Sequence, residues 1–314
     1  MERTHMGGDR WNRWSRTGTG LFLLIVLAGC PSQDGGESEA AAGAADTIAA
    51  FLISADPVLT PGTIQMLGLV FTVAPGWHLY WDGLNDSGLP ILVEPDLPPG
   101  VTAGALQWPA PRRLVSPGGI LDHVYEERVT LLLPISLSPD LAAGEKVILG
   151  CDLAWVACKE ACVYGQGRVE LTLPVAARGR SDSLTKGSMA GASSWTDRPA
   201  GLPAIPALMR EARERIPRPA AEAPQDLQLV WQPDAVRIRL PGADSLKFHF
   251  AASGSRPQAP IADGAAHGPE LRLRYPVSRS DTLRVAGVLE IARGGATEVY
   301  ELDLQQPPGR AGGS

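Results

Sequence analysis

Two cysteines separated by a three-residue loop are the feature of this chain most able to do chemistry. The sequence contains Cys30, Cys151, Cys158 and Cys162. A loop between Cys158 and Cys162 can bring their α-carbons within the roughly 4.4 to 6.8 Å that a disulfide requires. A disulfide that closes so short a loop adds little stability, yet on a loop it is open to attack by a thiolate. The spacing therefore favours thiol–disulfide exchange over a structural crosslink.

The surroundings of the pair leave its acidity open. Lys159 favours a neighbouring thiolate and Glu160 opposes it, so the two charges leave the direction of any shift in the thiol pKa undetermined. Cys151 alternates with Leu153 and Trp155 in an apolar segment. This pattern favours a buried small hydrophobic residue over a third redox partner.

Two other classes of function remain open at this point. Cys151, Cys158 and Cys162, with His78 or His123, could supply soft ligands to copper(I) or zinc, although their spacing matches no strong metal motif. A structural or assembly protein without catalysis is the other alternative. Replacing Cys162 by Ser separates them, because only an exchange protein would then trap or lose covalent partners.

Residues 1–29 have the layout of an export signal. Arginines precede the apolar run LFLLIVL, which is too short to cross a bilayer core. Ala28 and Gly29 then lead into Cys30, an arrangement that resembles the bacterial lipobox. We expect cleavage before Cys30, lipidation of that cysteine and a flexible tether over 30–47. The expected location is the periplasm, on a membrane whose identity, inner or outer, the sequence leaves undecided.

Length and composition indicate two folded domains. The chain has 314 residues, of which 44% are hydrophobic and 20% charged, a globular balance. The net charge of −6 offers no basic surface for phosphates, so nucleic acid is not an expected partner. With 35 Gly and 28 Pro, the chain favours many short strands joined by turns over long helices.

The apolar pattern divides the chain into two β-rich blocks. Residues 48–176 contain short apolar runs separated by Pro and Gly, and residues 225–306 contain runs in which apolar and polar residues alternate. Both patterns are typical of antiparallel sandwiches. Residues 177–224 lose this pattern and form a predicted linker with a short helix. The second block has no cysteine, and we interpret it as a spacer or docking module.

Four motifs carry a resemblance to a known family. WHLYWDGLNDSGLPILV (77–93) resembles the W-x-x-Y-W…D-S-G-L-P signature of the periplasmic amino-terminal domain of DsbD-type disulfide reductases. Three further segments follow in family order: WPAPRR (108–113), VTLLLPI (129–135) and AWVACKEACVYG (154–165). The second block is more weakly similar to the second immunoglobulin-like domain of the ScsB branch. The resemblance implies an all-β chain with two immunoglobulin-like β-sandwich domains.

The resemblance also assigns roles to the cysteines. It implies that Cys162 forms the mixed disulfide and that Cys158 resolves it, with no cofactor. By position, a cap loop over 114–126 would shield the pair, with Asp122 and Tyr125 as candidate cap side chains.

Aromatic residues near the motifs have two interpretations. Trp77 and Tyr80 could form a wall beside the disulfide, as could Trp81 and Trp155. Aromatic residues of a sandwich belong to its core more often than to a site.

The partners follow from the family. The resemblance implies electron donors that are membrane-embedded and thioredoxin-like, and clients that are periplasmic disulfide proteins. The family's membrane-spanning and thioredoxin-like regions have no counterpart in the 314 residues. We therefore expect either that separate proteins deliver the electrons or that the reductase role has been lost.

Overall fold

The computed structural model describes residues 47–176, 201–232, 234–276 and 282–307, which fall within one compact unit. The predicted signal, the lipidated Cys30 and nearly all of the tether lie outside the described residues, as do residues 177–200 of the predicted linker. Among the described residues, no helix is both long and apolar enough to cross a membrane.

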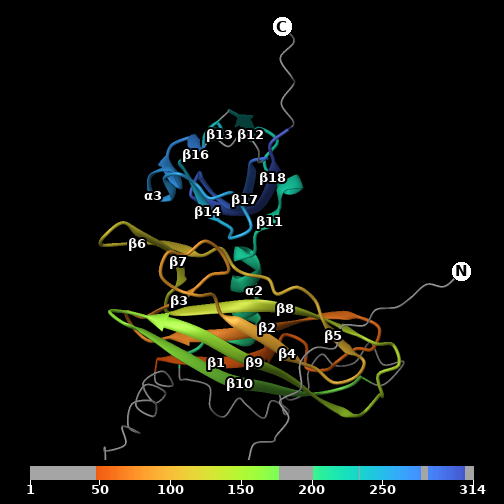
Figure 1. Ribbon diagram of the computed structural model, residues 1–314. Helices are drawn as coiled ribbons and strands as arrows, with labels where there is room; N and C mark the ends of the chain where they lie inside the picture. The colour runs from red at the N-terminus through yellow and green to blue at the C-terminus, as the bar shows by residue number, and fades with distance from the viewer. Residues whose placement is uncertain (1–46, 177–200, 233, 277–281, 308–314) are drawn as a thin grey trace, which may run out of the picture. The chain divides into compact units, whose positions relative to one another are not determined.

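The first sandwich consists of two antiparallel sheets, whose strands Figure 1 shows from red to green. One sheet has four strands in the order β1-β2-β8-β5, and the other has six, in the order β10-β9-β3-β7-β6 with β4 paired to β9. Their bounds are β1 Ile48–Ser54, β2 Ile64–Val73, β3 His78–Tyr80, β4 Leu92–Asp96, β5 Val101–Ala103, β6 Arg112–Ser116, β7 Ile120–Tyr125, β8 Arg128–Leu137, β9 Lys146–Cys158 and β10 Cys162–Pro174.

The core of this sandwich lies between the two sheets. Strand side chains alternate between two faces, and in β9 the positions Leu149, Cys151, Leu153 and Trp155 all point into the core. This arrangement confirms that Cys151 is a buried hydrophobic residue.

A helix covers the outer face of the four-stranded sheet. Helix α2, Ile205–Arg215, has a proline in its first turn, where a missing N–H costs nothing. Its buried residues Leu208 and Met209 pack against Val70 of β2 and Leu132 of β8. Strands β2 and β8 are therefore buried on both faces, which explains why their sequences are apolar runs instead of alternating patterns. The predicted linker helix is thus part of the first sandwich.

The second sandwich has a five-stranded sheet, β11-β18-β17-β14-β15, facing a three-stranded sheet, β12-β13-β16. Its first strand lies at residues 218–219, within the segment expected to be linker, and pairs with β18 in parallel. The fold is all-β with two immunoglobulin-like sandwiches, which confirms the sequence prediction. The remaining bounds are β11 Arg218–Pro219, a 3-10 turn Ala220–Glu222, β12 Gln228–Trp231, β13 Ala235–Arg239, β14 Ser245–Phe250, α3 Pro260–Asp263, β15 Ala265–His267, β16 Glu270–Arg274, β17 Arg284–Arg293 and β18 Ala296–Gln305.

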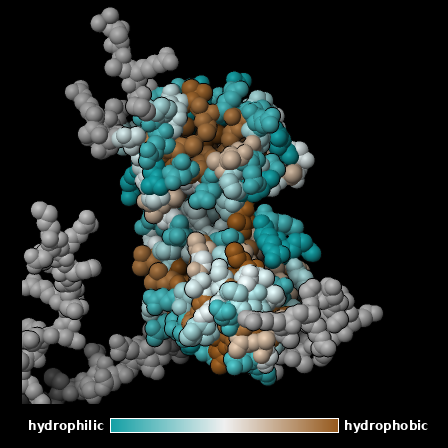
Figure 2. Space-filling model, turned by 90° about the vertical axis from the view of Figure 1, so that its right-hand side faces the viewer, coloured by the Kyte–Doolittle hydropathy of each residue, from teal (hydrophilic) through white to brown (hydrophobic). Residues whose placement is uncertain are grey.

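The surface is mixed in character. Figure 2 shows one face of the molecule, on which hydrophobic areas are interrupted by hydrophilic ones. Individual large hydrophobic side chains are nevertheless exposed, among them Leu89, Leu92 and Tyr164.

His123 of β7 is a buried titratable group. Its Nδ1 lies 2.7 Å from the Leu84 carbonyl oxygen, and its ring centroid lies 5.4 Å from that of His249. Its Nε2 has no hydrogen-bond partner among the described residues. Burial, assisted by the nearby His249, lowers the pKa of His123 to about 3. The ring is therefore neutral in the folded protein at physiological pH.

We expect acid to destabilise the fold through His123. Because its folded pKa lies below the unfolded value of about 6.5, the unfolded chain alone takes up a proton as the pH falls from 6.5 toward 3. As the pH falls below 6.5, the free energy of unfolding should therefore decrease by up to about 1.4 kcal/mol per pH unit. Urea unfolding between pH 7 and 4.5 measures this slope. His123→Gln retains a donor for the Leu84 carbonyl but cannot take up the proton, so the pH dependence of its unfolding free energy should be smaller by the contribution of one proton. An unchanged slope would show that His123 is not the group responsible.

Candidate redox site

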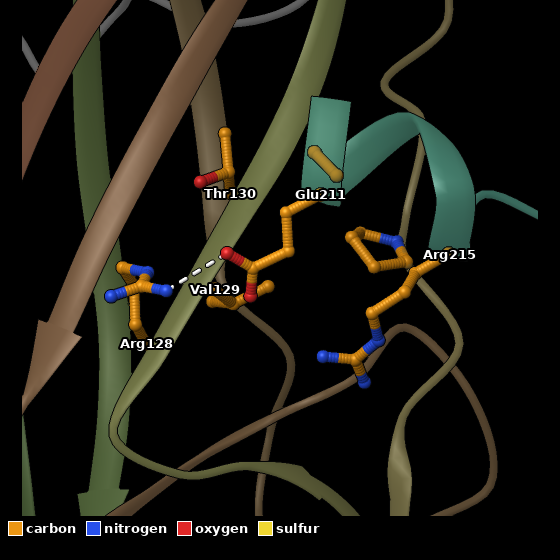
Figure 3. Close-up of a pocket in the computed structure, with 7 residues that line it drawn as sticks. Arg128, Val129, Thr130, Glu211 and Arg215 are labelled. Atoms are coloured by element: carbon orange, nitrogen blue, oxygen red, sulfur yellow. Dashed lines mark hydrogen bonds and ion pairs between the residues drawn. The ribbon is translucent and has the colours of Figure 1, made fainter. Parts of the chain in front are cut away.

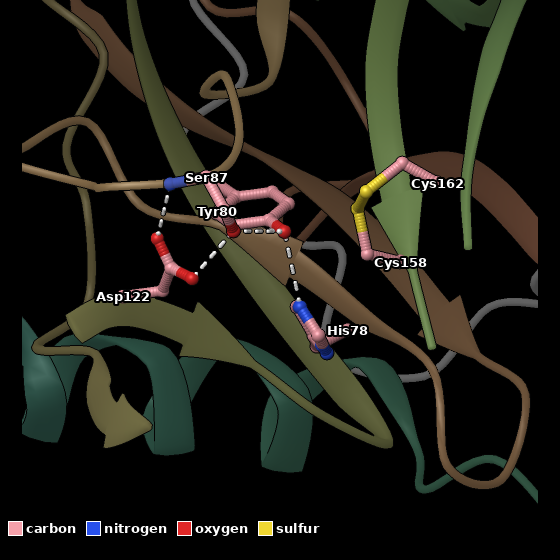
Figure 4. Close-up of a disulfide and its surroundings, with 6 residues drawn as sticks. All are labelled: His78, Tyr80, Ser87, Asp122, Cys158 and Cys162. Atoms are coloured by element: carbon pink, nitrogen blue, oxygen red, sulfur yellow. Dashed lines mark hydrogen bonds between the residues drawn. A yellow bond between two sulfur atoms is a disulfide. The ribbon is translucent and has the colours of Figure 1, made fainter. Parts of the chain in front are cut away.

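Cys158 and Cys162 form a disulfide at the end of the β9–β10 hairpin (Figure 4). The two residues are direct partners in the antiparallel register, and their α-carbons lie 4.1 Å apart. The Lys159 N–H donates to the Ala161 carbonyl at 3.2 Å and closes the turn. The pairing follows from hairpin register, because side chains of directly opposed residues share one face of the sheet.

The two sulfur-bearing residues differ in exposure. Cys158 is 4% exposed and packs with Tyr80 and Val124, whereas Cys162 is exposed. Cys162 is therefore the accessible member of the pair, and Cys158 is the shielded one.

The disulfide and Cys151 lie on opposite faces of the same sheet. Cys151 and Cys158 are an odd number of residues apart in β9, so strand alternation points them apart. Burial raises the pKa of the Cys151 thiol to about 11, which leaves this thiol protonated and unreactive. No group of three His, Cys, Asp or Glu side chains arranged to hold a metal occurs in the described part of the chain.

Tyr80 forms one wall of the site. Its side chain is buried against Cys158, and its hydroxyl lies 3.2 Å from both His78 Nε2 and Ser87 Oγ (Figure 4). Burial raises the pKa of Tyr80 and lowers that of His78, the latter opposed by the charge of Asp122. Both side chains are therefore neutral near pH 7 and connect to Asp122 through Ser87.

Asp122 holds the loop that follows β3. It is 2% exposed, and its carboxylate accepts hydrogen bonds from the Asp86 N–H at 2.9 Å, the Ser87 N–H at 3.0 Å and the Ser87 hydroxyl at 2.6 Å. Gly88 lies so close to the Tyr80 ring that a Cβ there would overlap it. The Asp-Ser-Gly sequence is thus explained: two residues bind Asp122, and the third lets the backbone lie on Tyr80.

The structure corrects part of the expected cap. Residues 114–126 form most of the β6–β7 hairpin, and Tyr125 lies in the core between the sheets, its hydroxyl donating to the Pro109 carbonyl at 2.5 Å. Tyr125 is not a cap side chain, because alternation along β7 turns it away from the face that carries Val124 and the disulfide. Trp77 is half-buried and packs against the same core.

Sequence reasoning missed Ser87 and Gly88 as site residues. Both belong to the D-S-G-L-P motif, and the available signal was that this motif follows Trp81 after only four residues, 82–85. Their partners could not be named, because Asp122 is 35 residues further along the chain.

A pocket elsewhere lies between α2 and β8 (Figure 3). There the Arg128 guanidinium donates to Glu211 at 2.8 Å, and Arg215 donates to the Ala110 carbonyl at 2.6 Å. These charged groups are already paired, and none of the lining residues belongs to the disulfide site.

The amino-acid sequence around this disulfide matches a known protein family. Residues 49–174 match the family described as thiol:disulfide interchange protein DsbD, N-terminal. No curated protein matches the chain.

Solved structures of two related domains are similar to the chain. The N-terminal periplasmic domain of ScsB from Proteus mirabilis is 13% identical, with 83% of this chain and 92% of that chain covered and a TM-score of 0.47. The DsbD N-terminal domain of Neisseria meningitidis in its reduced form is 14% identical, with 43% and 89% covered and a TM-score of 0.25. From the family match, the ordered motifs and the hairpin disulfide, we conclude that residues 49–174 form a DsbD-type N-terminal domain, a domain of thiol–disulfide interchange.

Proposed function

We propose that this protein relays electrons in the periplasm through the Cys158–Cys162 pair, from a membrane-embedded reductase and its thioredoxin-like carrier to disulfide-containing client proteins. The observation that carries the proposal is a hairpin disulfide with one exposed and one buried cysteine in a DsbD-type domain. Exchange between sulfur atoms needs no cofactor.

Reduction of the pair takes two steps. A donor thiolate attacks Cys162 Sγ, the bond between Cys162 and Cys158 breaks, and Cys158 leaves as a thiolate that takes up a proton. The donor's second thiolate then attacks the donor sulfur of the mixed disulfide and releases Cys162. Two electrons have moved, the donor is a disulfide, and the pair is a dithiol.

Reduction of a client reverses these roles. The Cys162 thiolate attacks the client disulfide, and the Cys158 thiolate then attacks Cys162 Sγ and releases the reduced client. Because the α-carbons of Cys158 and Cys162 lie 4.1 Å apart in the disulfide, the resolving thiolate is held beside Cys162 Sγ, which shortens the life of the mixed disulfide.

A redox titration tests the relay. We expect a reversible two-electron transition of the pair between about −120 and −270 mV, measured by the mass added on alkylation across a graded series of glutathione or dithiothreitol buffers. A pair that stays oxidised well below about −300 mV is a structural crosslink, and that result would overturn the proposal.

We further propose that lipidated Cys30 anchors the protein to a membrane. The support is the apolar run at 21–27 followed by Ala-Gly-Cys. In cell fractionation the unaltered protein should sediment with membranes, and Cys30→Ser should shift to the soluble periplasmic fraction. Membrane association that persists in Cys30→Ser would argue against the lipid anchor. Cys151→Ser serves as the control, because it changes a cysteine outside the signal.

A further inference from the structure

Exposed apolar side chains continue from the disulfide along the outer face of the six-stranded sheet. Tyr164 lies two residues after Cys162 in β10 and pairs with Val156, which lies two residues before Cys158 in β9. Residues two apart in a strand share a face, so both side chains stand beside the disulfide. Tyr164 is 63% exposed.

Two leucines extend this surface. Leu92 of β4 pairs with Ala154, the next position of β9 on the same face, and is 59% exposed. Leu89 is 67% exposed and lies between Gly88, which rests on the Tyr80 ring, and Pro90, which is bridged to Tyr80. We name Leu89, Leu92, Val156 and Tyr164 the exchange patch. Apolar side chains gathered at a reactive group are typical of an interaction site.

The same face becomes acidic beyond the exchange patch. Arg168 forms ion pairs with Asp96 at 2.6 Å, with Asp152 at 3.0 Å and with Glu170 at 2.9 Å. Glu94 stands opposite Asp152 in the β4–β9 register, so this part of the face carries a fourth carboxylate in addition to the three that pair with Arg168. Asp152 is six residues from Cys158, about 20 Å along an extended strand.

We infer that this face selects its exchange partner: a polypeptide whose reactive cysteine is bordered by apolar side chains and followed, about 20 Å away, by cationic ones. The apolar residues would cover the exchange patch while the thiolate attacks Cys162. The cationic groups would pair with the surplus carboxylates around Arg168, because complementary charge raises the rate of encounter. This inference rests on the proposed function and adds the chemistry of the partner to it.

The test uses two blocked peptides that differ only in charge. The cationic peptide is Cys-Thr-Leu-Thr-Leu-Thr-Lys-Thr-Lys, in which alternate residues share one side and the first Lys lies six residues from the Cys, and the anionic peptide has Glu in place of Lys. The excess peptide reduces the pair: one peptide thiolate attacks Cys162 Sγ, and a second then releases Cys162, leaving the protein dithiol and a peptide disulfide. The rate is followed at one pH by the mass added to the protein on alkylation. At low salt the cationic peptide should react about threefold to tenfold faster, and the difference should shrink in 0.5 M NaCl.

Three variants test whether the exchange patch contributes to the rate with the cationic peptide. Tyr164→Ser and Leu92→Ser should each slow the cationic peptide about threefold or more, because each removes an apolar contact. The matched control is Ile148→Ser, since Ile148 is 55% exposed on the same face of β9 but ten residues from Cys158. Reduction by dithiothreitol, which is too small to cover the face, should proceed at one rate in all of these proteins.

The outcomes separate this inference from the proposed function. Suppose that dithiothreitol reduces all of these proteins normally. Equal rates for both peptides, or equal slowing by all three variants, would then contradict partner selection by this face but not the redox relay. A pair that dithiothreitol cannot reduce in the folded protein would overturn the relay, and the selective face with it.

Discussion

Replacing Cys162 by Ser is expected to reduce exchange to the rate of the protein-free reaction, because the variant lacks the exposed sulfur that a thiolate attacks. Cys158→Ser should instead accumulate a mixed disulfide through Cys162, since no second thiol remains to resolve it. Both variants, reduced beforehand, are incubated with glutathione disulfide, whose cleavage by the remaining thiolate forms a mixed disulfide and releases glutathione. Non-reducing electrophoresis and mass spectrometry then identify the trapped species.

Loss of fold would not explain this result. The loop closed by the disulfide spans five residues, for which the chain-entropy model gives a contribution of about 2 kcal/mol. Both variants lose the same crosslink, so equal unfolding midpoints with opposite trapping identify chemistry as the cause. Trapping through Cys158 in Cys162→Ser, and none in Cys158→Ser, would reverse the assigned order of attack.

Replacing Asp122 by Ala is expected to lower the free energy of unfolding by about 3 kcal/mol. The carboxylate is buried and accepts two backbone N–H groups and the Ser87 hydroxyl. Its removal leaves the Ser87 N–H without this acceptor and the Asp86 N–H with only the longer bond to the Leu121 carbonyl at 3.2 Å. Urea unfolding at pH 7 measures the loss. Asp122→Asn is the matched control, because its amide oxygen can still accept from the backbone, and it should lose about 1 kcal/mol.

The same substitution should expose the buried cysteine. In the reduced protein, Asp122→Ala frees the 86–88 loop from its anchor, so Gly88 no longer lies firmly on Tyr80 and Cys158 becomes accessible. Iodoacetamide should then modify Cys158 faster than in the unaltered protein, while the rate at the exposed Cys162 changes little. Equal rates at Cys158 in the Ala and Asn variants would show that the loop does not shield it.

Local sequence was sufficient for the disulfide and for the fold class. The spacing of Cys158 and Cys162 implies a tight hairpin, and register then pairs them without help from distant residues. Alternation of Cys151 with Leu153 and Trp155 placed Cys151 in the core for the same reason, because a strand repeats every two residues. The two β-rich blocks were likewise visible, the first in apolar runs separated by Pro and Gly and the second in alternating apolar and polar residues.

The predicted cap loop is where local sequence was not sufficient. Position along the chain indicated 114–126, but Tyr125 is a core residue and the loop that lies on Tyr80 is 86–88. A one-residue difference in strand position decides between the two faces of a sheet, and sequence motifs alone did not resolve it for Tyr125.

By itself, the sequence determined the reactive pair, the two sandwiches and the family to which the redox domain is similar. Only the tertiary structure decided which cysteine is exposed, which loop lies on the tyrosine that packs against the other and where the acidic end of the exchange face lies. The reason is physical: Asp122 meets Ser87 across 35 residues and Arg168 meets Asp96 across 72. Such contacts depend on the order of strands in the sheet, which local residue patterns do not encode.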